Sequence, residues 1–192
     1  MYTYDYYITQ FTEAKIFVQN KVQPLSEELF TTSPGPERWC IAEIIMHLNK
    51  TAEVYTPIIK EGIDNAPDSK KYNGEPFKIG FLMKKFVHIV GPENQKLTPT
   101  IPQFLPVKDT KEFDREKIIN EFMEAQNQFI ELVSKSKVEH LVLNKLKVRN
   151  PIYSAIRMDV NACLAIMEAH QRRHFAQIEE LLSLERTAAE VD

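Results

Sequence analysis

The chain has 192 residues with a formal net charge of -3, and 43% of its residues are hydrophobic while 27% are charged. This length and composition predict one soluble globular domain over residues 1–192 with a sizeable core. The slight negative charge excludes a general attraction to nucleic acid or to anionic membranes, although it is compatible with a local basic patch.

Helical periodicity dominates the first third of the chain. Apolar residues recur at imperfect helical spacing over residues 8–30, and Pro24 is expected to kink or interrupt this first helix. Residues 31–36 contain two prolines and a glycine, which predicts a turn. A second amphipathic helix is expected over residues 37–55, with Trp39 near its start as an aromatic anchor in the core.

A long proline-rich insertion is expected over residues 65–113. This stretch holds six of the eleven prolines, so it cannot form one long element. Residues 77–90 are periodic and predict one short helix, which Gly91 and Pro92 should end. The remainder, including residues 98–106, is expected to be extended and to follow the surface. Long irregular segments of this kind often serve as lids or binding walls.

Two more helices complete the predicted fold. The third should begin after Asp114, a candidate N-cap residue, and continue to about residue 135. Residues 138–157 predict a connector with a short strand or extended piece at 141–143, and the last helix is expected over residues 159–184. Four long amphipathic helices with few strand candidates predict an all-α four-helix bundle.

Three of the five histidines form the candidate functional site. His170 and His174 are four residues apart on the last helix, so both imidazoles project from the same face. His47 lies within the apolar stripe of the second helix, and bundles build metal sites from side chains that project inward from facing helices. Three imidazoles leave one tetrahedral position open, as in catalytic zinc sites, but they also suit nickel, iron and copper. The alternative is a hydrogen-bonded core cluster without metal, because a pair with this spacing also occurs by chance.

Glu43 is a candidate fourth group of this site. It lies four residues before His47 on the same helix face, so it can serve as a ligand, as a hydrogen-bond partner of a ligand or as a general base. The alternative is a carboxylate at the helix start that Arg38 or solvent satisfies. His88 and His140 lie in the insertion and in the connector, where we expect them to be exposed.

The two cysteines are expected to be reduced and buried. Cys40 and Cys163 each lie seven residues before a candidate ligand, about 10.5 Å along a helix, which is too far for each to share an ion with that ligand. They form no CxxC motif. The N-terminal residues show no basic stretch followed by an apolar core, and no apolar run approaches about 20 residues. We therefore expect neither a signal peptide nor a membrane span, and a cytoplasmic location.

Two segments resemble the DinB-like (YfiT-like) metalloenzyme superfamily. The segment Arg38-Trp-Cys-Ile-Ala-Glu-Ile-Ile-Met-His-Leu48 is similar to the family's Trp-Ser-x-x-Glu-x-x-x-His-Leu, and His170-Gln-Arg-Arg-His174 is similar to its His-x-x-x-His. The resemblance implies that His47, His170 and His174 bind a divalent metal such as nickel or zinc. It also implies an up-down-down-up four-helix bundle that often forms homodimers.

The resemblance also implies a function. Characterised relatives include metal-dependent transferases that use low-molecular-weight thiols such as bacillithiol or mycothiol, and some isomerases. We therefore expect a thiol S-transferase or a hydrolase that acts on a small-molecule substrate and activates a thiol or water at the metal. Glu43 is the expected proton acceptor. Arg173 is expected to meet an anionic group on a thiol cofactor, with a solvent-facing arginine as the alternative.

Two alternatives from other functional classes stay open. One is a metal-free or metal-storing bundle whose role is binding or dimerisation, with the histidines as remnants of a site. The other is a small-ligand binding module that uses the proline-rich insertion as one wall of its site. Stoichiometric metal distinguishes the enzyme from the first alternative, and turnover distinguishes it from the second.

Overall fold

The computed structural model describes residues 1–36, 38–67, 74–94, 100–106, 113–153 and 155–189. In chain order its helices and strands are α1 (Tyr4–Phe17), the π-helical turn η1 (Val18–Val22), α2 (Glu27–Thr31), α3 (Ile41–Asp64), α4 (Phe81–Val90), the 3₁₀ turn η3 (Pro102–Phe104), α5 (Arg115–Val138), the 3₁₀ turn η5 (Leu143–Lys145), β1 (Lys147–Arg149), β2 (Arg157–Asp159) and α6 (Val160–Ala189). The expected all-α fold is therefore confirmed. None of the described helices is long and apolar enough to cross a lipid bilayer.

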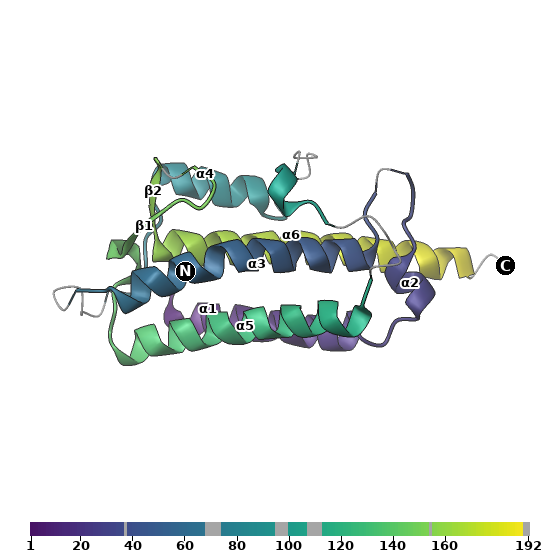
Figure 1. Cartoon of the computed structure of the whole chain (residues 1–192), viewed down its shortest axis with the longest axis horizontal. Coiled ribbons are helices and arrows are strands. Elements are labelled where there is room, and N and C mark those ends of the chain that lie inside the picture. The colour runs from purple at the N-terminus through teal and green to yellow at the C-terminus, as the bar shows by residue number, and fades with distance from the viewer. Residues whose placement is uncertain (37, 68–73, 95–99, 107–112, 154, 190–192) are drawn as a thin grey trace.

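Four helices, α1, α3, α5 and α6, form the bundle (Figure 1). The end of α5 meets the start of α1, where Lys137 pairs with Asp5 at 2.6 Å, so these two helices are antiparallel. The same end of α5 meets the end of α3, where Lys135 pairs with Asp64 at 2.7 Å, so α3 and α5 are parallel. Helix α6 starts at this end of the bundle and runs in the direction of α1. The order is up-down-down-up, as the family resemblance implies.

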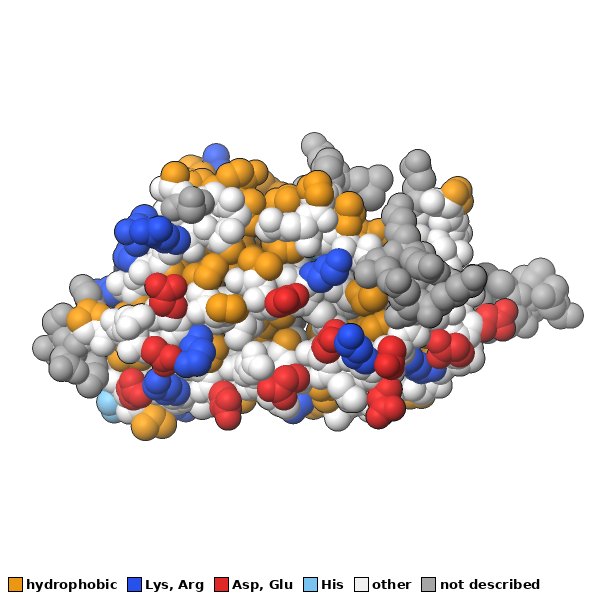
Figure 2. All heavy atoms as spheres, in the orientation of Figure 1, with side chains coloured by type: hydrophobic (Ala, Val, Ile, Leu, Met, Phe, Trp, Pro, Cys, Tyr) orange, Lys and Arg blue, Asp and Glu red, His pale blue; other side chains and the backbone are white. Residues whose placement is uncertain are grey.

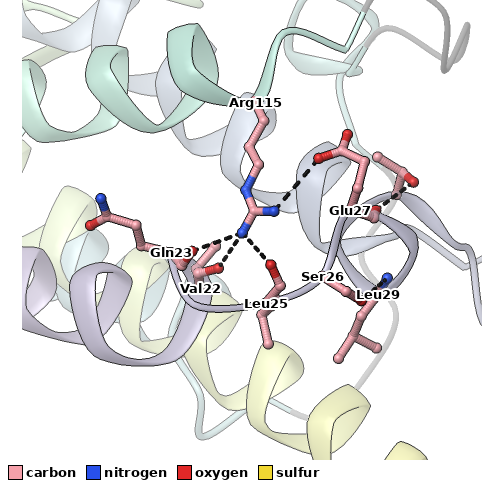
Figure 3. A network of polar contacts seen from close by, with 8 residues as sticks. Val22, Gln23, Leu25, Ser26, Glu27, Leu29 and Arg115 are labelled. Carbon is pink, nitrogen blue, oxygen red and sulfur yellow. Dashed lines mark hydrogen bonds and ion pairs between the residues drawn. The ribbon is translucent and has the colours of Figure 1, made fainter.

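The first predicted helix is broken in the structure. Helix α1 and the turn η1 come first, the chain then turns at Pro24, and α2 follows. Figure 3 shows how Arg115, at the start of α5, holds this turn. Its guanidinium donates to the carbonyls of Val22, Gln23 and Leu25 at 3.2, 2.9 and 2.7 Å. Carbonyls at the end of a helix lack partners within it, so this arginine supplies donors from another helix.

Helix α3 begins four residues later and ends nine residues later than predicted. Cys40 is extended, and its backbone N–H donates to the Glu43 carboxylate at 2.9 Å, which fixes the start of the helix. Pro57 lies inside the helix, but Ile59 and Ile63 continue the buried stripe beyond it. Burial of that stripe outweighs the one backbone hydrogen bond that the proline removes.

The insertion contains the predicted short helix, α4, which ends as expected at Gly91 but begins four residues later than predicted. A second element, η3, lies in the stretch that was expected to be extended. Residues 98 and 99 of that stretch lie outside the described residues. Helix α4 packs on α6, and Figure 2 shows hydrophobic side chains on its outer side, where Phe81 and Leu82 are exposed.

The second half of the bundle follows the prediction except in the connector. Helix α5 is confirmed with Asp114 as its N-cap, since the Asp114 carboxylate accepts the Lys117 N–H at 3.0 Å. Of the extended piece expected at 141–143, Leu141 lies in a β-bridge, whereas Leu143 begins η5, and the antiparallel hairpin of β1 and β2 follows only after η5. Helix α6 starts within one residue of the predicted position and ends five residues later than predicted.

The core consists of two apolar clusters with a polar layer between them. Tyr7, Phe11 and Phe129 belong to one cluster, and Phe122 and Ile178 belong to the other. Buried polar residues lie near the junction of the two clusters along α3, α5 and α6: His47, Thr51, Gln126, Gln171 and His174. The Gln171 amide donates to the Gln126 amide oxygen at 3.0 Å, so this part of the layer is internally hydrogen-bonded.

Candidate metal centre

Three imidazoles from two helices meet in the polar layer. His47 lies on α3, and His170 and His174 lie on the facing side of α6. The Nε2 atom of His170 is 3.1 Å from the Nε2 atoms of both His47 and His174. All three candidate ligand atoms lie within 4.8 Å of one another. The fold therefore brings together the three histidines that were predicted to form a metal site.

Hydrogen bonds orient two of the three rings. The Nδ1 atom of His47 lies 2.7 Å from the carbonyl oxygen of Phe104, and the Nδ1 atom of His174 lies 3.0 Å from Oε1 of Gln177. Both partners are acceptors, so each Nδ1 carries the proton and each Nε2 presents its lone pair toward His170. This is how protein groups usually orient histidines that bind a metal.

The third ring, His170, has unmet hydrogen-bonding capacity. Its Nδ1 atom is buried and has no hydrogen-bond partner among the described residues. Its Nε2 atom can donate a proton to His47 or to His174 but not to both, so one lone pair of the cluster stays unbonded. Nitrogens bound at about 2.0 to 2.1 Å to one tetrahedral ion lie about 3.3 Å apart. Two of the three separations, both 3.1 Å, are close to this value, and the third, between His47 and His174, is at most 4.8 Å. Three imidazoles at these distances suit a divalent ion that prefers imidazole, such as zinc or nickel.

Burial keeps the three imidazoles neutral. It lowers the pKa of His170 well below the ordinary value, and the neighbouring His174 and His47 lower this pKa further. Burial and then His47 lower the pKa of His174 to about 3. Burial also lowers the pKa of His47, although its hydrogen bond to Phe104 opposes the shift. Neutral imidazole is the form that binds metal ions, so at neutral pH the cluster can bind one without first losing protons.

Trp39 and the insertion enclose the cluster. Between ring centroids, Trp39 lies 4.9 Å from His47 and 6.1 Å from His174. The insertion is held next to the cluster by Lys50, which donates to the carbonyl of Leu105 at 2.7 Å. Trp39 was predicted only as a core anchor. Its contact with two candidate ligands gives it a second role, since an indole beside the rings excludes water from them.

Comparison with known proteins identifies the family. A sequence model of the DinB superfamily matches residues 18–178. The chain belongs to the DinB superfamily. This is a metal-binding family of helical proteins, and the matched range contains all three histidines of the cluster.

A curated relative and the solved structures add little to this assignment. The DinB chain is 30% identical over 69 residues to an uncharacterized protein, YuaE, of Bacillus subtilis (strain 168). The matched stretch covers 36% of this chain and 42% of that protein's length. No solved structure gives a significant match.

Glu43 has a structural contact in this DinB protein. Its Oε2 atom accepts the backbone N–H of Cys40 at the start of α3. The carboxylate therefore caps the start of the helix, in line with the alternative of a carboxylate that is satisfied at the helix start. Its partner is a backbone amide, however, and not Arg38 or solvent. Its predicted role in proton transfer stays a prediction.

Arg173 also has structural contacts. It directly precedes the candidate ligand His174, but its Nη1 atom donates to the carbonyls of Ile89 and Gly91 at 3.5 and 3.3 Å and to that of Asn94. It therefore ties the end of α4 to α6. Its predicted contact with a thiol cofactor stays a prediction.

The remaining histidines and the cysteines lie where they were expected. His88 and His140 are exposed, and Cys40 and Cys163 are buried free thiols. Burial raises the pKa of the Cys40 thiol to about 11 and raises that of Cys163 as well. Neither cysteine is therefore a thiolate nucleophile at neutral pH.

Two groups that orient the ligands were not predicted. Phe104 acts through its backbone carbonyl, so its side chain gave no signal. Gln177 lies three residues after His174, a spacing that places both on one helix face, so it could have been found by asking which polar residue follows each histidine at helical spacing. The DinB site thus extends beyond its three histidines to the insertion and to the next turn of α6.

Proposed function

We propose that this DinB protein is a metal-dependent enzyme, either a thiol S-transferase or a hydrolase, that acts on a small-molecule substrate. The observation that carries the proposal is the convergence of three neutral imidazoles, from His47, His170 and His174. Three ligands leave the fourth position of a tetrahedral site for a thiol or a water. A divalent ion at this site, with zinc or nickel as candidates, supplies Lewis-acid chemistry, which favours loss of a proton from a bound thiol or water.

The protein's own residues orient the imidazoles, shield them from water and accept a proton. The Phe104 carbonyl and the Gln177 amide hold two imidazoles with Nε2 directed inward. Trp39 covers two of the rings and limits the access of water to them. The Oε2 atom of Glu43 is held by the Cys40 N–H, and we propose that its other oxygen, Oε1, accepts the proton of the reacting group.

The alternative function is metal binding without catalysis. One observation favours it, since Glu43 and Arg173, the candidates for chemistry and for cofactor binding, both make structural hydrogen bonds. In the enzyme proposal Arg173 exchanges some of its carbonyl partners for an anionic group of a low-molecular-weight thiol. In the alternative it keeps them, and the metal stabilises the bundle.

Metal content tests whether the site binds an ion. We expect the purified protein to contain about one divalent ion per chain, as a single three-histidine site predicts. His170→Ala should lose the ion and the thermal stabilisation that added zinc or nickel produces. His88→Ala, which removes an exposed histidine, is the matched control and should retain both. A protein without stoichiometric metal, whose melting temperature does not respond to either ion, would contradict the proposal.

Turnover tests whether the site is catalytic. The metal-loaded protein is incubated with a panel of low-molecular-weight thiols and electrophiles, and with hydrolysable esters and amides, and products are identified by mass spectrometry. Glu43→Gln should retain the metal and lose most of the turnover, because an amide cannot accept the proton. Saturable binding of thiols without any product, in a protein that holds its metal, supports the alternative instead.

A further inference from the structure

A cleft of about 370 Å³ lies at the end of the bundle where α3 meets the β1–β2 hairpin. The last turn of α3, with Glu61, and its C-cap residue Asn65 form one wall, and the residues of β1 form the other. Glu61 follows His47 by 14 residues on the same helix, which corresponds to about 21 Å along its axis. The cleft is therefore separate from the histidine cluster.

Basic side chains dominate the lining of this cleft. Among the described residues, Lys145, Lys147, Arg149 and Arg157 line it together with one carboxylate, that of Glu61. All four basic residues are exposed, and Figure 2 shows basic side chains gathered near this end of the molecule. The chain as a whole is slightly acidic, so this local positive charge is opposite in sign to its net charge. A positive cleft attracts anions from solution.

Two of these cations are placed directly opposite each other. Arg149 and Arg157 are partners in the antiparallel register, so their side chains emerge side by side on one face of the hairpin. The next pair, Lys147 and Asp159, neutralises itself with an ion pair of 3.0 Å. The guanidinium groups of Arg149 and Arg157 have no hydrogen-bond or ion-pair partner among the described residues. Like charges directly opposite in a sheet are destabilising, and an anion between them would remove that cost.

Backbone donors add to the side chains. The Leu146 carbonyl accepts the Val160 N–H at 3.0 Å, and the Asn150 N–H donates to the Ile156 carbonyl at 2.9 Å, so both groups point toward β2. The backbone N–H and C=O groups of successive residues in an antiparallel strand point alternately to its two edges. The N–H groups of Lys147 and Arg149 therefore point toward the free edge of β1. Both residues line the cleft. The hairpin therefore offers neutral donors and guanidinium groups together, which is the combination that recognises phosphate and carboxylate oxygens.

We propose that this cleft binds a small molecule that carries a phosphate or a carboxylate group, with Arg149 and Arg157 as its main contacts. Glu61 and the C-terminal end of α3 make the opposite wall negative, so the anionic group lies at the hairpin and the uncharged part of the molecule lies toward α3. This binding does not depend on the metal or on the reaction proposed above.

The test is a titration of the full-length protein with inorganic phosphate, and separately with succinate, at constant ionic strength. Amide and Arg Nε–H signals are followed by ¹H–¹⁵N correlation spectra. We expect saturable shifts at the Lys147 and Arg149 amides, and at least a tenfold weaker Kd in the double variant R149Q/R157Q. The matched control is K21Q/K117Q, which removes the same charge from exposed lysines at the opposite end of the bundle and should bind as the unmodified protein does.

Three results would overturn the proposal. One is the absence of saturable shifts with both anions. Another is equal weakening in R149Q/R157Q and K21Q/K117Q, which indicates a diffuse charge effect. The third is unchanged binding in R149Q/R157Q, as expected if the anion binds at the histidine cluster instead. Because both arginines are exposed and face a like charge, the double variant should melt at or above the temperature of the unmodified protein, which confirms that it is folded.

Discussion

The Nδ1 atom of His47 donates a hydrogen bond of 2.7 Å to the carbonyl of Phe104 and so joins a candidate metal ligand on α3 to the insertion. The bond orients the ring, and it also holds the segment around η3 against the bundle. Anything that fixes the His47 ring should therefore also stabilise the docked insertion. Since coupling between two equilibria is reciprocal, release of the insertion should weaken metal binding.

Zinc should slow amide hydrogen exchange in residues 101–106. The N–H groups of Phe104 and Leu105 are bonded within η3, and they exchange when this turn leaves the bundle. Exchange measured by mass spectrometry, with and without zinc, checks the effect. Lys50→Met removes the other tether, so it should raise exchange in both states but keep the response to zinc. His47→Ala should abolish the response, and a response of unchanged size in that variant would contradict the coupling.

Gln177→Ala should weaken zinc binding by about tenfold, because groups that orient a histidine ligand typically contribute a factor of this size or more. The variant loses the acceptor for Nδ1 of His174, so the ring can rotate or adopt the other tautomer. Isothermal titration with zinc measures the change. Gln128→Ala, a half-buried residue of α5 whose amide bonds to Glu124, is the control and should bind zinc normally. Equal affinities in the two variants would show that Gln177 does not orient the ligand.

The metal-free protein should lose stability as the pH falls below about 6.5. A histidine in the unfolded chain takes up a proton near pH 6.5, whereas the pKa of His174 in the folded protein is lowered to about 3. Between these two values the unfolded chain binds the extra proton. The free energy of unfolding should therefore fall by about 1.4 kcal/mol per pH unit for this histidine alone, and His47 and His170 should add to the slope.

Urea unfolding in the presence of a chelator, at about pH 7, 6 and 5, measures this slope across the window in which it is expected. His174→Gln removes one of the buried titrating groups, so its slope should be shallower. His88→Gln removes an exposed histidine and should leave the slope unchanged. Stability that is constant from pH 7 to pH 5 would mean that the imidazoles are not buried in the neutral form.

Arg115→Ala should lower the free energy of unfolding by about 2 kcal/mol, because it leaves partly buried carbonyls without the charged donor that satisfies them. Arg115→Lys should recover only part of this loss, since lysine has a single terminal nitrogen and cannot keep both the carbonyl contacts of Nη2 and the ion pair of Nη1 with Glu27. Urea unfolding measures both changes. Lys117→Ala, two residues away on the exposed face of α5, should cost less than about 0.5 kcal/mol. If Arg115→Ala costs no more than Lys117→Ala, Arg115 does not hold the turn at Pro24 as proposed.

Helical spacing predicted the four bundle helices, because the buried apolar residues of each recur at helical intervals, although imperfectly in the first helix. It did not predict where α3 begins, since that position depends on the hydrogen bond between the Cys40 N–H and Glu43. It also misplaced the connector strand. Leu141, Val142 and Leu143 are all buried, and a short apolar run of this kind is shared by strands and buried turns. Strands of three residues, such as β1, are too short for alternation to stand out.

The candidate site was predicted unevenly. Residue type and spacing were enough to group His170 with His174, and the apolar stripe placed His47 on the inner face of its helix. The direction of each helix came from the family resemblance, because spacing contains no information on direction. The contact of Phe104 with His47 could not be predicted from the sequence. Every residue has a backbone carbonyl, and the position of this one depends on how the insertion folds back onto the bundle.

The parallel arrangement of α3 and α5 has a consequence for how members of this superfamily can diverge. The chain must return along the length of α3, about 36 Å, which an extended segment of roughly ten residues can span. About 50 residues lie between Asp64 and Arg115, so most of this insertion is not needed to connect the two helices. Its length and sequence can change in evolution without disturbing the bundle. Because the insertion supplies the acceptor for His47, such changes can alter the orientation of this candidate ligand while all three histidines are kept.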